Sequence, residues 1–284
     1  MITSRAYAPG DLRSMLGLIS ELWPEGRHGI GYAFMAQRLP FDDWEARLWF
    51  DGPLFVGWAW STGWRQPRGL SYELRPGYEW LFRDLLDWSQ PRTTTLRNGD
   101  EAIEAVLHER GFVHDPDAPW LRWSSRPLDE VERPSIPEGY RLSTMAEHVD
   151  FGSRAAAHRS AFTVPGRESR FSDDVYAAVR QETPWRGDLD CVILDPEEQV
   201  AAFALVWLDE LNRVGELEPV GVRAEHQRHG LGRAVCLHAL RQLQEAGAET
   251  ALVGSRGDDG HPGPRLLYES IGFREAWRML AFTR

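Results

Sequence analysis

The chain has 284 residues, which is long for one compact domain and sufficient for two. Hydrophobic residues make up 42% of it and 13 residues are Trp, so large cores can form. The formal net charge of −11 disfavours a nucleic-acid partner and would attract a cationic amine substrate, although a need for solubility explains the charge equally well.

Signals for export or membrane insertion are missing from the sequence. No apolar run is long enough to span a bilayer, and residues 1–20 lack the charged start, apolar block and cleavage site of a signal peptide. We therefore expect a cytoplasmic protein without a membrane partner. Cys191, in a predicted strand, and Cys236, in a predicted helix, fit reduced core residues better than a disulfide or a metal pair.

The first half of the chain alternates strand and helix patterns. Period-two and helical spacings of apolar residues, together with turn and capping residues, define these elements. In chain order we expect a strand at 2–7, helices at 9–22 and 34–39, a hairpin of 46–50 with 54–60, a strand at 70–74, a helix containing 80–88, a strand at 93–96, a helix from Asp100 to His108 and a strand at 121–123.

The second half repeats this order after a segment with linker chemistry, residues 124–139, which contains three prolines among charged residues. We expect a strand at 140–142, helices at 145–158 and 171–181, a hairpin of 190–194 with 200–207, a strand at 215–222, a helix from Leu231 toward Gly247, a strand at 250–254, a helix at 264–270 and a strand at 277–282. The matching order predicts a tandem duplication.

The strand at 215–222 leads into a glycine-punctuated turn and a helix. Alternation along the strand predicts that Glu216, Glu218, Val220 and Val222 share one face. Two glycines at a helix N-terminus let the backbone approach a ligand, and the unpaired N–H groups of the first turn favour a phosphate. The spacing fits neither the dinucleotide fingerprint nor a P-loop.

The motif Val222-x-x-x-x-Gln227-x-x-Gly230-x-Gly232 resembles the acetyl-CoA-binding motif of the GNAT superfamily of N-acetyltransferases. The segment Leu267-Tyr-Glu-Ser-Ile-Gly-Phe273 resembles the second signature of that family. The resemblance covers residues 140–284 well and residues 2–126 only in layout. The two-domain members of the superfamily, including mycothiol synthases and antibiotic-modifying acetyltransferases, have a similar organisation.

This resemblance implies an α/β fold of two tandem domains, each a splayed mixed sheet flanked by helices. The expected domains are 1–126, a degenerate copy without cofactor, a linker at 127–139, and 140–284, which binds acetyl-CoA. The first copy has Arg75-Pro-Gly-Tyr-Glu-Trp80 where the second has its glycine turn, although a degenerate and still occupied site stays an alternative. Its expected task is to form a wall of the substrate cleft.

In the second copy, the resemblance places acetyl-CoA on one continuous segment. The pantetheine arm would pair with the backbone of Val220, Gly221 and Val222. The pyrophosphate would lie on the turn and the first residues of the helix, namely Gln227, Arg228, His229, Gly230, Leu231, Gly232 and Arg233.

Acetyl transfer to an amine requires a group that accepts the amine proton and one that protonates the leaving thiolate. Glu216 occupies the position of the general base in several relatives, and Glu218 follows two residues later, so either can serve; both could instead hold a cationic substrate or a structural Arg. Tyr268 matches the family's tyrosine near the cofactor sulfur and is the expected general acid, the alternative being a packing role.

The expected acceptor site is built from residues near the first helices of the second copy. The candidates are His158, Arg159, Phe162, Trp185, Trp207 and Asp209, although Trp and Phe side chains more often belong to a core. Three histidines, at positions 226, 229 and 238, match no zinc signature, and we expect no metal.

The sequence therefore predicts an acetyl-CoA-dependent N-acetyltransferase that acts on a small amine, as a monomer or a homodimer. The alternative is a non-catalytic module that binds or senses acyl-CoA.

Overall fold

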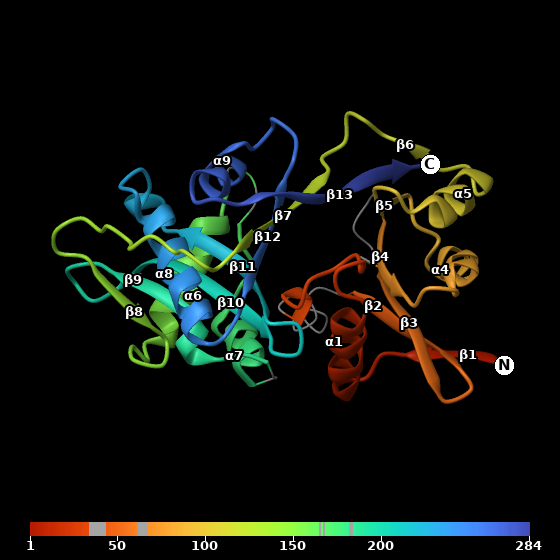
Figure 1. Ribbon diagram of the computed structural model, residues 1–284, viewed down its shortest axis with the longest axis horizontal. Helices are drawn as coiled ribbons and strands as arrows, with labels where there is room; N and C mark the ends of the chain where they lie inside the picture. Colours follow the sequence, from red (N-terminus) through yellow and green to blue (C-terminus); the bar gives the residue numbers. More distant parts are fainter. Residues whose placement is uncertain (34–43, 62–67, 165, 167, 182–183) are drawn as a thin grey trace. The chain divides into compact units, whose positions relative to one another are not determined.

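The computed structural model describes all residues except 34–43, 62–67, 165, 167 and 182–183 (Figure 1). The helix expected at 34–39 lies outside the described residues. Contacts group the chain into two compact units: Met1–Trp123 with Ser255–Pro264 and Glu275–Arg284, and Ser124–Gly254 with Arg265–Arg274. Among the described residues, no helix has the length and apolar character needed to cross a membrane.

The first unit contains a mixed sheet with the strand order β1-β2-β3-β4-β5-β13, and β6 pairs with β13. Neighbouring strands are antiparallel except β4 and β5, which are parallel. The bounds of these strands are Ile2–Ala6, Glu45–Asp51, Leu54–Ser61, Gly69–Leu74, Thr93–Arg97, Arg274–Thr283 and, for β6, Val113–His114. Its helices are α1 (Leu12–Glu21), α4 (Phe82–Ser89) and α5 (Glu101–Glu109). Side chains of α4 and α5 form one core with those of the sheet.

The C-terminal strand β13 belongs largely to the first unit. Its residues Met279–Thr283 pair with Arg97–Thr93 of β5 in antiparallel register. Residues 255–264 and 275–284, which the sequence division assigned to the second domain, therefore cluster with the first unit.

The second unit has the strand order β12-β11-β10-β9-β8, in which only β11 and β12 are parallel. The bounds of these strands are Thr250–Arg256, Val214–Val222, Val200–Asp209, Asp190–Leu194 and Arg141–Thr144. Its helices are α6 (Phe151–Phe162), α7 (Asp173–Gln181), α8 (Leu231–Glu245) and α9 (Gly263–Ser270). The remaining strand, β7 (Leu121–Pro127), contains the point where the chain passes from the first unit to the second.

Helices α8 and α6 cover opposite faces of this second sheet. Along β9, Cys191 and Ile193 belong to the core under α8, whereas Val192 and Leu194 belong to the core that includes Ala157 of α6. Successive strand residues point to opposite faces, so this alternation assigns the faces directly.

A β-bulge changes the alternation along β11. Its register shifts between Ala204, which lies opposite Val220, and Val206, which lies opposite Leu217. Residues 218–219 of β11 therefore face the single residue between these two on β10. A bulge of this kind places one extra residue on a strand and reverses the facing of the residues that follow.

Because of this bulge, the prediction that Glu216, Glu218, Val220 and Val222 share one face of the strand is wrong. Val220 and Val222 pack against the core under α8, as does Leu217. Glu216 precedes Leu217 and points to the other face, the one that α6 covers. The carboxylate of Glu216 and the two valine side chains are thus separated by the sheet.

The start of helix α6 and the expected linker differ from the sequence prediction. Helix α6 begins at Phe151 and not near residue 145, because Asp150 caps it by accepting a hydrogen bond from the Ser153 N–H at 2.9 Å. Residues 128–137 lack regular structure but are anchored on the second unit. Leu128 is 2% exposed in the core under α8, and its N–H donates to the Glu249 carbonyl at 2.9 Å.

Candidate functional site

The sheet of the second unit opens between its two parallel strands. β11 pairs with β12 only at Val214–Thr250, Gly215–Ala251 and Glu216–Leu252. Beyond Glu216, β11 pairs with β12 at no further residue in the described part of the chain. The edge of β11 at residues 220–222, which follow Pro219, thus presents backbone N–H and C=O groups that an extended ligand can pair with.

The turn after β11 exposes the N-terminus of a long helix. α8 has 15 residues, and its N-cap, Gly230, has φ 79°, a left-handed conformation that favours glycine. Residues 227–230 are exposed. The first-turn N–H groups of such a helix attract anions, so the turn can hold a phosphate group.

Gly232 leaves open space at this helix start. A Cβ built on Gly232 would lie 3.5 Å from Leu267 and from Val222, which is ordinary van der Waals contact. The protein fold alone therefore does not require glycine at this position. A ligand that approaches the backbone here would require it.

The two arginines of the turn differ in availability. The Arg233 guanidinium forms two hydrogen bonds with the Glu132 carboxylate, at 3.2 and 2.7 Å, and this pairing raises its pKa. Arg228 is exposed, and no ion pair involves it among the described residues. Arg228 is therefore the more available cation for a phosphate.

Glu216 and Glu218 lie where the sheet opens. Glu216 is 3% exposed and pairs with Trp207 of β10. The indole Nε1 of Trp207 donates to the Glu218 carbonyl at 2.6 Å, which fixes the backbone at the bulge. The structure thus brings these three predicted site residues together.

Tyr268 lies on α9 and is 7% exposed. Its ring meets that of Phe273 edge to face, with the centroids 5.9 Å apart. Burial, and the nearby Cys236 and Glu218, raise the pKa of Tyr268 well above its ordinary value. The phenol therefore stays protonated at neutral pH and can donate a proton.

Two of the expected acceptor residues lie on the same face of the sheet as Glu216. His158 of α6 stacks on Phe162, with ring centroids 4.5 Å apart, and on Phe203 of β10 at 5.7 Å. Phe203 pairs with Gly221, where a Cβ would approach within 2.8 Å of Ala161. The C-terminal end of α6 thus packs directly against β11.

Three further expected acceptor residues are bonded within the protein. Arg159 pairs with Asp173 at 2.8 Å, and the Trp185 indole donates to Asp190 at 3.3 Å. The Asp209 carboxylate accepts hydrogen bonds from the backbone N–H groups of Leu211 and Asn212 in the turn between β10 and β11. These contacts give Asp209 a turn-forming role.

Sequence reasoning missed a buried ionic network behind His158. Arg154 and Asp190 are 1% and 0% exposed, and Arg154 Nε donates to the Asp190 carboxylate at 2.9 Å. The Tyr176 hydroxyl donates to the same carboxylate at 2.7 Å. The only sequence signal was an Arg one helical turn before His158, on the face that α6 buries.

A second missed arrangement holds the segment before the turn. His226 ends a short 3-10 turn, Ala224–His226, and its Nδ1 lies 2.9 Å from the Tyr140 hydroxyl. Its Nε2 lies 3.4 Å from Asp195, which belongs to the turn between β9 and β10. His226 thus ties the start of the glycine turn to two other parts of the second unit.

The chain shares sequence with known acetyltransferases. Residues 157–273 match the model of the acetyltransferase (GNAT) family. Mycothiol acetyltransferase from Saccharomonospora viridis is 27% identical over 184 residues, which are 62% of this chain and 59% of that protein. The enzyme of the same name from Nocardiopsis dassonvillei is 32% identical over 204 residues, covering 66% of this chain and 60% of the relative.

A third relative covers more of the chain. Mycothiol acetyltransferase from Thermobispora bispora is 28% identical over 239 residues, covering 80% of this chain and 79% of the relative. For other curated relatives, the chain spans less than two thirds of their length. The share is 59% for the Saccharomonospora viridis enzyme, 60% for the Nocardiopsis dassonvillei enzyme and 49% for the enzyme of the same name from Streptomyces coelicolor.

Solved structures resemble the whole chain in fold. A GCN5-related N-acetyltransferase from Sphaerobacter thermophilus has a TM-score of 0.65 at 15% identity, covering 100% of this chain and 95% of the other. A tandem GNAT protein from the clavulanic acid biosynthesis pathway also has a TM-score of 0.65, at 17% identity, with 100% and 98% coverage. At these identities the similarity establishes the fold alone.

Proposed function

This chain belongs to the acetyltransferase (GNAT) family, as its glycine turn and tyrosine segment predicted. We therefore propose that its second unit transfers an acetyl group from acetyl-CoA to the amine of a small molecule. One observation carries the proposal: beyond Glu216, the edge of β11 pairs with no described residue of β12, and it leads directly into the exposed N-terminus of α8. An extended amide chain on the edge and a pyrophosphate on the helix match the two parts of CoA.

Glu216 and Glu218 are the candidate bases for the reaction. One of these carboxylates accepts the proton of the attacking amine while the nitrogen bonds to the thioester carbonyl carbon. Glu216 is preferred, because its side chain is buried at the point where β11 leaves β12. Glu218 is the alternative, since its backbone is held by Trp207 beside the same opening.

Tyr268 is the candidate acid. As the carbon–sulfur bond breaks, the phenol gives its proton to the leaving thiolate, so that free CoA and the acetylated amine are the products. The role requires a protonated phenol, and the Tyr268 phenol is protonated across the neutral range because burial raises its pKa. The base and acid then recover their starting protonation states by exchange with solvent.

The acceptor is proposed to be a small, cationic amine. The net charge of −11 favours the approach of cations. On the face of the sheet that α6 covers, His158 and Phe162 supply aromatic groups and Glu216 supplies a carboxylate. Because three relatives are named mycothiol acetyltransferase, the amine precursor of mycothiol is a natural first acceptor to test.

The test measures free CoA released from acetyl-CoA in the presence of a polyamine, an aminoglycoside, an aminosugar or the mycothiol precursor. We expect at least one amine to accelerate release and to gain an acetyl group by mass spectrometry. If calorimetry shows tight acetyl-CoA binding and no amine accelerates release, a non-catalytic acyl-CoA-binding module replaces the enzyme. Absence of acetyl-CoA binding would reject both functions.

A further inference from the structure

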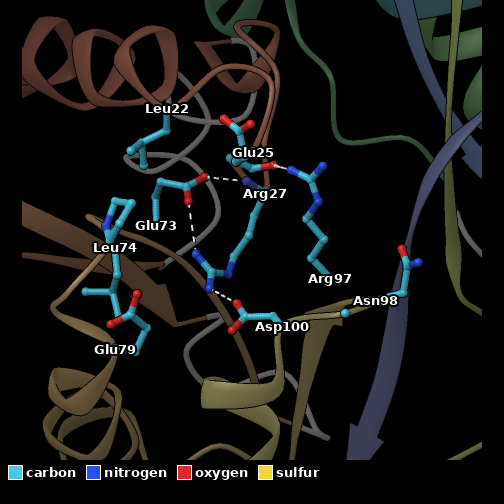
Figure 2. A pocket seen from close by; sticks show the side chains of 12 residues that line it. Leu22, Glu25, Arg27, Glu73, Leu74, Glu79, Arg97, Asn98 and Asp100 are labelled. Atoms are coloured by element: carbon cyan, nitrogen blue, oxygen red, sulfur yellow. Dashed lines mark hydrogen bonds and ion pairs between the residues drawn. The ribbon is translucent and has the colours of Figure 1, made fainter.

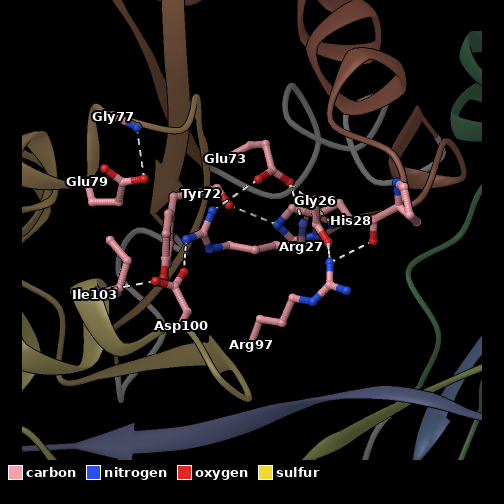
Figure 3. A network of polar contacts seen from close by, with 11 residues as sticks. Gly26, Arg27, His28, Tyr72, Glu73, Gly77, Glu79, Arg97, Asp100 and Ile103 are labelled. Atoms are coloured by element: carbon pink, nitrogen blue, oxygen red, sulfur yellow. Dashed lines mark hydrogen bonds and ion pairs between the residues drawn. The ribbon is translucent and has the colours of Figure 1, made fainter.

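The first unit also has a sheet that opens between its two parallel strands, but a segment of the chain lies across the opening. Within the described residues, β4 and β5 pair at Gly69–Thr93 and Leu70–Thr94 and at no others. The loop after α1 then bridges the two strands (Figure 3). The ring of His28 bonds to the Tyr72 carbonyl of β4 at 3.1 Å, and Arg97 of β5 donates to the Pro24 carbonyl at 2.9 Å.

Arg27, at the centre of this loop, has its charge fully compensated. It is 7% exposed and pairs with Glu73 at 3.2 Å and with Asp100. The backbone N–H of Arg27 also donates to Glu73, at 2.9 Å. Two carboxylates thus surround one buried guanidinium, and the loop is held firmly in the opening.

Arg97 differs from Arg27 because no carboxylate in the part of the chain that the structure describes pairs with it. Its Nη1 donates to the carbonyls of Pro24 and Gly26, and its guanidinium lies over the Trp277 ring, 4.7 Å from the centroid. Burial lowers the pKa of Arg97, and the nearby carboxylates of Glu73, Glu25 and Asp100 offset this only in part. Among the described residues, no hydrogen bond uses its Nε or Nη2.

These two free donors lie side by side on a planar group whose orientation is already fixed. That is the geometry with which Arg binds a carboxylate through two parallel hydrogen bonds. A ligand carboxylate would therefore pair with this guanidinium at little cost in side-chain entropy.

A pocket of ≈ 330 Å³ adjoins Arg97, at the low end of the range for small-molecule sites (Figure 2). Leu22, Leu74 and Pro76 give it an apolar part. Glu25, which is exposed, and Glu79, which is half-buried, add two carboxylates that are not used to compensate Arg27. Acidic side chains outnumber basic ones in the lining, so a phosphate with several charges would be repelled.

We propose that this pocket binds a small free amino acid with an apolar side chain, whose carboxylate pairs with Arg97. The ligand's ammonium group faces the carboxylates of Glu25 and Glu79, and its side chain contacts Leu22, Leu74 and Pro76. The site lies entirely in the first unit and does not depend on the acetyl transfer proposed for the second.

Calorimetry with L-leucine as the probe tests the proposal on the full-length protein. Two analogues each lack one charge: L-leucine methyl ester has no carboxylate, and 4-methylpentanoate has no amine. We expect leucine to bind and both analogues to bind at least about tenfold more weakly, which is the loss of one charge-assisted contact. The proposal is overturned if leucine does not bind, or if the methyl ester binds as tightly as leucine. It is also overturned if inorganic phosphate displaces leucine when its concentration is below that of leucine.

Variants place the binding at this pocket. Arg97→Lys keeps the charge but loses the paired donors, and we expect at least about tenfold weaker leucine binding. Arg83→Lys, on an exposed ion pair with Glu109 in the same unit, is the matched control and should bind as the parent does. If Arg97→Lys folds poorly, the double variant Glu25→Gln/Glu79→Gln tests the ammonium contact with the same expected loss.

The result must also exclude leucine binding as an acceptor in the second unit. Glu216→Gln and Phe162→Ala, which change the side of the sheet proposed to receive the acceptor, should therefore leave leucine affinity unchanged. Weaker leucine binding in either variant, or unchanged binding in both pocket variants, would reject the first-unit site. Neither result would bear on whether the second unit transfers acetyl groups.

Discussion

Glu216 of β11 pairs with Leu252 of β12, and this pair is the last of the register between the two described strands. From the next residue onward, no described residue of β12 pairs with β11, and the buried Glu216 side chain lies where the opening begins. A carboxylate at this place lies beside the strand edge on which the thioester arm is proposed to run.

Glu216→Gln should lower kcat strongly, by about 10²- to 10⁴-fold, because a positioned general base contributes that much. KM for acetyl-CoA should change little, since the proposed contacts of CoA begin further along β11. Steady-state kinetics with Glu218→Gln as the comparison decides between the two carboxylates. If Glu218→Gln shows the larger fall in kcat, the roles of the two residues are reversed.

Tyr268→Phe should reduce kcat while leaving acetyl-CoA affinity nearly intact, because the ring still packs against Phe273 and only the proton donor is lost. Burial raises the pKa of Tyr268, so the phenol of the parent stays protonated as the pH rises to the ordinary tyrosine value of about 10. We therefore expect no alkaline fall in the parent's kcat from this group below that pH. A fall near pH 8 that disappears in Tyr268→Phe would contradict the raised pKa.

Gly232→Ala should weaken acetyl-CoA binding without weakening the fold. The new Cβ makes only ordinary contacts with Leu267 and Val222, and alanine favours a helix over glycine by up to about 1 kcal/mol. A pyrophosphate on the helix N-terminus would meet that Cβ, so we expect at least about a tenfold rise in Kd. Thermal unfolding and calorimetry separate the two effects. Gly17→Ala, in α1 with open space around it, is the control and should leave Kd unchanged.

The glycine turn and the helix after it could be predicted from the sequence because their signals are local. Backbone φ at Gly230, the capping of α5 by Asp100 and the turn between β2 and β3 each depend on residues close in sequence. The family rests on the resemblance of the glycine turn and the tyrosine segment to GNAT motifs, and the mixed-sheet fold is what that resemblance implies. The proposal of Tyr268 as the acid rests on the same kind of signal, since its segment ends in the Gly-Phe pair that closes α9.

Other features depend on partners far apart in the chain. The bulge at residues 218–219 is set by the register with β10, and strict alternation along β11 could not reveal it. The assignment of β13 to the first unit depends on its pairing with β5. The pairing of Arg27 with Glu73 and Asp100 likewise joins three segments, none of which carries a motif.

His28 should make the first unit less stable in acid. Burial lowers the pKa of His28 to about 3, so the folded chain leaves the ring neutral while the unfolded chain protonates it below about pH 6.5. Its contribution to stability is therefore complete above that pH and is lost as the pH falls toward 3. His28→Gln, whose amide can still donate to Tyr72, should flatten this dependence by up to about 1.4 kcal/mol per pH unit. Denaturant unfolding across the acidic range measures it, with the exposed His108→Gln as control; parallel curves for parent and His28→Gln would contradict the burial of a neutral ring.

Asp190→Asn should destabilise the second unit much more than Asp188→Asn, although the two aspartates lie close together in sequence and each pairs with an arginine. Asp190 and Arg154 are almost fully buried, so the substitution leaves the Arg154 charge without its carboxylate, at a cost of about 3–5 kcal/mol. The Asp188 side chain is 49% exposed and its ion pair with Arg186 is screened by water, so its loss should cost no more than about 1 kcal/mol.

Denaturant unfolding of both variants measures this difference. Because His158 lies one helical turn after Arg154 and stacks on Phe203, the Asp190 variant should also disturb the side of the sheet proposed to receive the acceptor. KM for the amine should then rise in Asp190→Asn while KM for acetyl-CoA stays near that of the parent. Equal stability of the two variants would contradict this prediction, because it would show that the buried Arg154 charge does not depend on the Asp190 carboxylate.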